Sequence, residues 1–162
     1  MKHSLTVRPH WLANLSFVLG VGVSVAGTVG MQAQPKPAKV AVTVYKTPTC
    51  GCCSKWVEHM KSNGFDVKAI DMDDVDPIKR ANGVPTKMES CHTALVGGYV
   101  VEGHVPAASV QRMLREKPAI AGIAAPGMPV GSPGMEVPNV KPEAYSVMAF
   151  DKAGKSTVYE NR

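Results

Sequence analysis

The fold of this chain is constrained most strongly by one stretch of sequence: a valine-rich strand followed by a cysteine cluster at the start of an amphipathic helix. Valine occupies every second position from Val40 to Val44, which predicts a β-strand over residues 40–45. Apolar side chains then follow the i, i+3, i+4, i+7 spacing of one helix face: Cys53, Trp56, Val57 and Met60. Asn63-Gly64 predicts the end of that helix. Three of the four cysteines, Cys50, Cys52 and Cys53, therefore lie where the strand turns into the helix.

The next part of the chain predicts alternating strands and helices. In chain order we expect a strand at 65–72, a short helix with Asp76 as N-cap and Pro77 at its first position, and strands at 91–96 and 99–101 around a Gly97-Gly98 turn. A helix that starts at Pro106 and is ended by Lys117-Pro118 should follow. Two strands joined by a helix pair in parallel. The order β-α-β-α-β-β-α predicts an α/β fold of the thioredoxin-like type, with the domain spanning residues 40–162.

A long irregular segment is expected after these elements. Residues 119–140 are rich in proline and glycine, and Pro-Gly-Met occurs twice, at 126–128 and 133–135. A loop of this length is often functional. Residues 145–150 and 156–159 then predict a C-terminal β-hairpin.

The first 33 residues are predicted to be a secretory signal peptide. Lys2 and Arg8 precede a run from Leu12 to Val29 without charged residues, and Ala33 offers a cleavage point. A membrane anchor is the alternative, because the uncharged run has about the length of a membrane span. The run is rich in glycine, serine and alanine, which favours cleavage and a periplasmic location. Residues 34–39 would be a Pro/Lys linker.

Composition narrows the range of partners. The formal net charge of +5 comes without a run of basic residues, and no aromatic array could stack on bases, so nucleic acid is excluded as a partner. Contact with a membrane is expected only through an uncleaved signal segment. Adjacent cysteines are poorly suited to structural disulfides, because the loops that they would close are too short to constrain the chain. Even in an oxidising compartment, the cluster therefore indicates a local redox or metal site.

Two chemistries compete for the cysteine cluster. Cys50 and Cys53 have the C-x-x-C spacing of a thiol–disulfide oxidoreductase at the start of a helix, where the helix dipole favours a thiolate. Cys52 lies between them and would compete in that mechanism by forming non-productive disulfides. In the predicted fold, however, Cys91 begins a central strand and approaches the other three. Four converging thiolates indicate a soft metal.

Copper fits this pattern better than zinc. Structural zinc sites take two separated pairs of ligands, whereas here three cysteines cluster and one is distant. Adjacent cysteines bridge two ions more easily than they chelate one, so a copper(I)–thiolate cluster is expected. Four further residues are candidates for additional ligands or for contacts that support the ligands: His92, His104, Met128 and Met135. The histidines would also suit copper(II).

Three of the histidine and tryptophan positions carry more specific expectations. His92 follows Cys91 in the expected strand, so its side chain should point to the opposite face. His59 is expected on the solvated outer face of the first helix, and Trp56 in the core beneath the cysteines.

Four motifs in this order resemble an exported bacterial metal-binding family. The motifs are Thr-Pro-Thr-Cys-Gly-Cys-Cys-x-x-Trp (47–56), Gly-Val-Pro followed by Ser-Cys-His-Thr (83–93), Glu-Gly-His-Val-Pro (102–106) and the repeated Pro-Gly-Met segment (126–135). That family carries a Cys-x-Cys-Cys domain of unknown function and is associated with copper resistance. The resemblance covers about residues 40–160. It implies a thioredoxin-like fold, copper bound through Cys50, Cys52, Cys53 and Cys91, and a periplasmic role in copper tolerance.

The sequence thus predicts a periplasmic protein that holds copper(I) on four thiolates, with copper ions and other periplasmic copper-handling proteins as its partners. Two alternatives stay open at this point. One is a thiol–disulfide oxidoreductase that uses Cys50 and Cys53, and the other is a copper redox enzyme.

Overall fold

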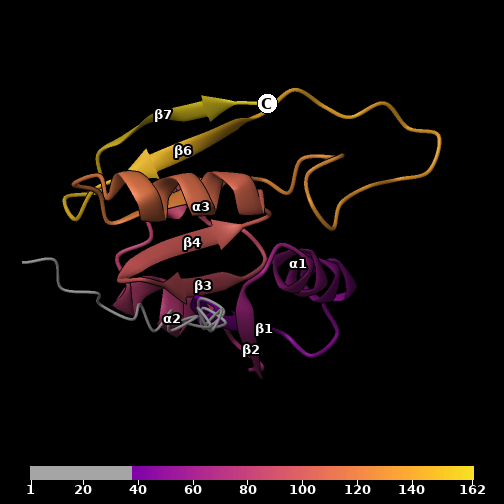
Figure 1. Ribbon diagram of the computed structural model, residues 1–162, viewed down its shortest axis with the longest axis horizontal. Helices are drawn as coiled ribbons and strands as arrows, with labels where there is room; N and C mark the ends of the chain where they lie inside the picture. Colours follow the sequence, from indigo (N-terminus) through magenta and orange to yellow (C-terminus); the bar gives the residue numbers. More distant parts are fainter. Residues whose placement is uncertain (1–37) are drawn as a thin grey trace, which may run out of the picture. The chain divides into compact units, whose positions relative to one another are not determined.

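A computed structural model of the protein describes residues 38–162, which form a mixed seven-stranded sheet with helices packed on it (Figure 1). The predicted signal peptide (1–33) and the first part of the predicted linker lie outside the described residues. The strands are β1 (Ala41–Lys46), β2 (Asp66–Asp71), β3 (Thr93–Val96), β4 (Tyr99–Gly103), β5 (Gly122–Ala125), β6 (Ser146–Phe150) and β7 (Ser156–Asn161). The helices are α1 (Gly51–Ser62), α2 (Asp76–Ala81) and α3 (Ala107–Glu116), with a 3₁₀ turn, η1 (Thr86–Met88).

The strands lie side by side in the order β2-β1-β3-β4-β5-β6-β7. β1 pairs in parallel with β2, and β4 in parallel with β5, while the other neighbours are antiparallel. The first seven elements, apart from the 3₁₀ turn, follow the predicted order β-α-β-α-β-β-α. The predicted α/β class is therefore confirmed, and so are the hairpin around Gly97-Gly98 and the C-terminal hairpin.

Helices cover both faces of the sheet. One buried cluster joins Trp56 and Met60 of α1, Val110 and Met113 of α3, and inward-facing strand residues such as Val44. A second, smaller cluster lies on the other face. It joins Val84 and Met88, from the segment that follows α2, to Val100 and Phe150 on the sheet. Because successive side chains of a strand point to opposite faces, the central strands β4 and β5 are buried on both sides, whereas β2 and β7 at the edges carry exposed residues.

Helix α1 forms as its apolar spacing predicts. Its buried side chains are Cys53, Trp56, Val57 and Met60, the four that the sequence places on one face. Asn63 caps its C-terminus, and Gly64 follows with a φ of 89°, a conformation that costs glycine little. Trp56 is fully buried and its indole N–H donates to the carbonyl of Val105 at 2.8 Å. The expectation that Trp56 belongs to the core is thus confirmed.

Strand β5 was not expected. It lies inside the segment that the sequence predicts to be irregular, and all four of its residues are buried. A strand buried on both faces has no apolar–polar alternation, and its residues Gly122, Ala124 and Ala125 carry little β-propensity of their own. A side chain at Gly122 would collide with the carbonyl of Val100, so this glycine lets β5 approach β4 and extend the sheet to the C-terminal hairpin.

Two element boundaries also differ from the prediction. Helix α2 begins at Asp76, with Val75 in the N-cap position, and the carboxylate of Asp74 accepts the N–H of Asp76 at 2.9 Å. The expectation of Asp76 as N-cap is therefore wrong by one residue. Strand β3 begins at Thr93, so Cys91 and His92 lie in the loop that enters it. Among residues 38–162, no helix is long and apolar enough to cross a membrane.

The packing of α1 leads to a test of stability. Replacing the fully buried Met60 by alanine should lower the free energy of unfolding by about 2–5 kcal/mol, because the sheet cannot close over the cavity. Urea unfolding followed by circular dichroism measures this. Glu58→Ala, on the exposed side of the same helix, should change it by less than about 0.5 kcal/mol. Equal effects of the two substitutions would contradict the packing described here.

Candidate metal centre

The first three cysteines are positioned by the turn from β1 into α1. Cys50 is the N-cap residue: its backbone is extended, and its Sγ accepts the N–H of Cys53 at 3.3 Å. Cys53 is fully buried beneath the first turn, while Cys52 stays half-buried at the surface. The N-terminal amides of α1 therefore face the cluster, where the helix dipole favours negative charge.

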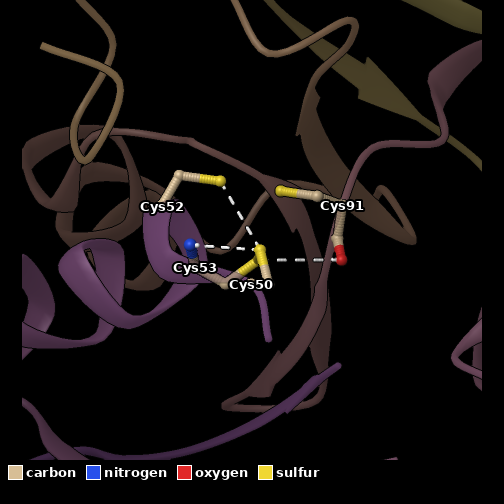
Figure 2. A group of neighbouring side chains, drawn as sticks. All are labelled: Cys50, Cys52, Cys53 and Cys91. Carbon is tan, nitrogen blue, oxygen red and sulfur yellow. Dashed lines mark hydrogen bonds between the residues drawn. A yellow bond between two sulfur atoms is a disulfide. The ribbon is translucent and has the colours of Figure 1, made fainter. Parts of the chain in front are cut away.

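Cys91 reaches the other cysteines because β1 and β3 are antiparallel neighbours. Tyr45 near the end of β1 pairs with Thr93 at the start of β3, so the residues just beyond each strand meet at one end of the sheet. The sulfur atoms of Cys50, Cys52, Cys53 and Cys91 all lie within 4.8 Å of one another. Figure 2 shows the side chains of Cys52 and Cys91 directed toward each other above Cys50. The predicted convergence of four cysteines is therefore found.

Two of the four cysteines are oxidised in this structure. Cys50 and Cys53 form a disulfide, and Cys52 and Cys91 are free. The Sγ of Cys52 lies 3.5 Å from that of Cys50, and the Sγ of Cys53 lies 3.8 Å from the carbonyl oxygen of Cys91. A disulfide sulfur is a poor metal ligand compared with a thiolate, so four thiolates become available only after this bond is reduced.

Two histidines extend the cluster on the side of Cys91. Nε2 of His104 lies 2.9 Å from the Cys91 sulfur, and Nδ1 of His104 lies 2.8 Å from the carbonyl oxygen of Pro133. A carbonyl only accepts, so Nδ1 carries the proton and the Nε2 lone pair faces Cys91. Such an arrangement is typical of metal-binding histidines, whose second nitrogen is held by a backbone carbonyl. His104, a candidate from the sequence, thus lies at the site.

His92 lies closer to the site than expected. Its Nδ1 is 3.4 Å from the Cys91 sulfur, and its ring packs against Trp56 and, edge-on, against His104. The expectation that it points to the opposite face is wrong, because the residue precedes β3 and strand alternation does not apply to it. The side chain is fully buried, and its Nε2 has no hydrogen-bond partner among residues 38–162. Cys91, His92 and His104 form a second group of potential ligands within 4.8 Å of one another.

The second Pro-Gly-Met segment lies against the site. Gly134, with a φ of 87°, approaches the first turn of α1 so closely that a Cβ would lie 2.7 Å from the carbonyl oxygen of Cys52. Only glycine fits there without a shift of the backbone. Together with the contact from Pro133 to His104, this places the segment before Met135 over the cysteines. Met135 is half-buried, whereas Met128 of the first repeat is 41% exposed.

His59 has a role that the sequence did not indicate. It is half-buried rather than solvated, and its Nε2 accepts the N–H of Ala107 at the start of α3 at 3.1 Å. Pro106, the N-cap residue, provides no side-chain cap, so His59 supplies the acceptor that this helix lacks. Burial lowers the pKa of His59, which keeps the accepting nitrogen unprotonated.

Comparison with known proteins connects this geometry to a family. Residues 88–135 match the family described as a protein of unknown function, DUF411. A solved structure titled copper resistance protein copG, form 2, is 41% identical to this chain, with a TM-score of 0.73 over 77% of this chain and 99% of that one. The chain belongs to this copper-resistance family. Form 1 of the same protein is also 41% identical, with a TM-score of 0.72 over 77% of this chain and 98% of the other. No curated protein matches the chain.

The DUF411 match covers only part of the candidate site. It contains Cys91, His92, His104 and both Pro-Gly-Met segments, but it begins at residue 88 and so leaves out the turn that carries Cys50, Cys52 and Cys53. The similarity to the copG structures extends over most of the domain. The fold brings the Cys50–Cys53 turn, which lies outside the match, together with Cys91, which lies inside it.

Burial favours the neutral forms of Cys91, His92 and His104. Burial and the neighbouring Cys52 raise the pKa of the Cys91 thiol to about 12. Burial lowers the pKa of His104, and burial together with His104 lowers that of His92. Neutral imidazoles bind metals directly, whereas a thiol must first lose its proton. A metal at Cys91 would therefore release a proton at any pH below about 12.

The raised pKa leads to a prediction for the reactivity of Cys91. In chelator-treated protein, its alkylation by iodoacetamide should be slow near neutral pH and rise about tenfold per pH unit to at least about pH 10, because the thiolate is the nucleophile. Mass spectrometry of the peptide that carries Cys91 measures the rate. In urea the rate should instead level off above the ordinary cysteine pKa of about 8.5. A plateau below about pH 9 in the folded protein would contradict the buried, protonated thiol.

Proposed function

We propose that this protein holds copper(I) in copper resistance, bound to the thiolates of Cys50, Cys52, Cys53 and Cys91 once the disulfide is reduced. The observation that carries the proposal is the convergence of the four sulfur atoms within 4.8 Å. Thiolates are soft ligands that select copper(I). The similar copG structures are of a copper resistance protein, which supports the biological context.

The arrangement of donors favours more than one copper ion. The four sulfurs form one group, and Cys91 forms a second group with His92 and His104. A tetrahedral zinc ion uses about four ligands, so this donor set exceeds the needs of one ion. A bridging Cys91 thiolate would let two or more copper ions share the site. Met135, half-buried beside Gly134, is proposed as an additional thioether donor or as cover for the cluster, and the exposed Met128 as a more distant one.

We further propose that the scaffold is thioredoxin-like and that it acts in the periplasm. The strand order β2-β1-β3-β4, with α1 joining β1 to β2 and α3 after β4, supports the scaffold. The disulfide is compatible with an oxidising compartment. Copper-handling proteins of the same compartment would be its partners.

Copper titration tests the main proposal. The reduced mature protein should bind more than one copper(I) in competition with a chelator, and Cys52→Ser and Cys91→Ser should each lower the stoichiometry, because each removes a thiolate ligand. Ser54→Ala, a matched change on the exposed side of α1, should leave it unchanged. An unchanged stoichiometry in both cysteine variants would refute the four-thiolate site.

A second candidate function is thiol–disulfide exchange, which the Cys50–Cys53 disulfide at the start of α1 favours. It requires turnover of a disulfide substrate by chelator-treated protein, and this turnover should survive Cys91→Ser but not Cys50→Ser. Absence of turnover excludes it. The same disulfide would serve a copper redox enzyme, and absorption spectra recorded during anaerobic addition of copper(II) would reveal a change in the oxidation state of the metal.

Processing gives a separate test of location. If residues 1–33 are a signal peptide, the protein recovered from the periplasmic fraction should begin at Gln34. Intact-mass measurement of that fraction decides this. Recovery of the uncleaved chain in the membrane fraction would instead support an anchor.

A further inference from the structure

We infer that a buried ion pair between Lys79 and Glu102 positions Cys91 for metal binding. This inference rests on the proposed copper function, since it assigns a role toward that site. Glu102 lies on β4 and is fully buried, and Lys79 of α2 is 3% exposed. Neither residue belongs to the groups of potential metal ligands. We regard both as positioning residues.

The carboxylate of Glu102 accepts three hydrogen bonds. Its Oε1 accepts Nζ of Lys79 at 2.5 Å and the backbone N–H of Ser90 at 2.6 Å. Its Oε2 accepts the hydroxyl of Thr93 at 2.7 Å. Nζ of Lys79 also donates to the hydroxyl oxygen of Thr93 at 3.2 Å. Ser90 immediately precedes Cys91 and Thr93 follows His92, so one carboxylate holds the backbone N–H before the two potential ligands and the side chain after them.

Three consecutive residues of the chain contact this loop. The Glu102 carboxylate binds Ser90 and Thr93, the N–H of Gly103 donates to the carbonyl of His92 at 2.9 Å, and Nε2 of His104 lies 2.9 Å from the Cys91 sulfur. Gly103 has a φ of 71°, and a side chain there would collide with that of Ser90. The end of β4 therefore fits closely along residues 90–93.

An ion pair is a costly way to hold a short helix to a sheet. Burying two charges usually costs as much as their attraction returns, and apolar residues of similar volume stabilise at least as well. A carboxylate adds direction, because its hydrogen bonds fix the positions of the groups that donate them. Here those groups flank Cys91, which no helix or strand holds. The pair therefore orients the Cys91 thiol before a metal arrives, and such preorganisation raises metal affinity.

Removing the carboxylate tests this inference. Glu102→Gln should weaken copper(I) binding by about 10–100-fold, the usual effect of losing a residue that orients a ligand. The stoichiometry should stay the same, because all cysteines remain. Binding is measured on the reduced mature protein by chelator competition, and X-ray absorption should show fewer sulfur neighbours per copper. Glu160→Gln is the matched control: this carboxylate contacts Ser109 and Arg112 and joins β7 to α3.

A double-mutant cycle separates positioning from general stability. In a Cys91→Ser background, Glu102→Gln should have no further effect on affinity, because the ligand that it orients is gone. If Glu102→Gln does not fold, Thr93→Val removes one of the three hydrogen bonds and should weaken binding in the same direction. The inference is overturned if the copper(I) affinity of Glu102→Gln, or of Thr93→Val where Glu102→Gln does not fold, stays within twofold of wild type. It is also overturned if the same substitution still weakens binding in the Cys91→Ser background. It is equally overturned if Glu160→Gln weakens binding as much.

The outcomes also distinguish the two proposals. If Cys91→Ser by itself leaves copper binding unchanged, the proposed four-thiolate site fails and the inference fails with it. If Cys91→Ser weakens binding but Glu102→Gln does not, the copper site stands and only the positioning role is lost.

Discussion

The pairing of β1 with β3 is the interaction on which the rest of the site depends. It places the end of one strand beside the start of the other, through register partners such as Tyr45 and Thr93. Each strand continues into a segment that carries cysteines, and the two segments are separated by about forty residues in sequence. Backbone hydrogen bonds between neighbouring strands hold them about 4.8 Å apart, a spacing that sulfur atoms on adjoining loops can bridge. The candidate metal centre is thus a consequence of sheet topology.

Protonation and oxidation set the conditions under which the centre can work. Cys91 has a pKa raised to about 12, so metal and proton compete for its sulfur. Cys50 and Cys53 are joined in a disulfide, so electrons must also be supplied before they become ligands. The histidines are neutral and need neither step. If the site binds copper as proposed, its affinity should therefore rise with pH and with the reducing strength of the surroundings.

Much of the fold and of the site could be predicted from local patterns. The valines of β1, the apolar face of α1 and the glycine pair of the β3–β4 hairpin each have a short-range signature, and each prediction holds. The sequence did not predict β5, because a strand of small residues that is buried on both faces has no alternation of apolar and polar positions. The predicted orientation of His92 was wrong because β3 begins only at the next residue. The predicted exposure of His59 was wrong because its partner, the N–H of Ala107, lies far away in sequence. The Lys79–Glu102 pair has no sequence signature at all.

The sequence by itself determined the chemistry: thiols at C-x-C-C spacing at a helix start, a distant Cys-His pair and a repeated Pro-Gly-Met loop, all within an α/β pattern. These depend on residue type and local periodicity, which a sequence states directly. Only the tertiary structure decided which side chains meet. It joined Cys91 to the cluster, turned His92 and His104 toward it and placed a buried carboxylate behind it. Such contacts depend on strand order and register, which arise from packing over the whole domain.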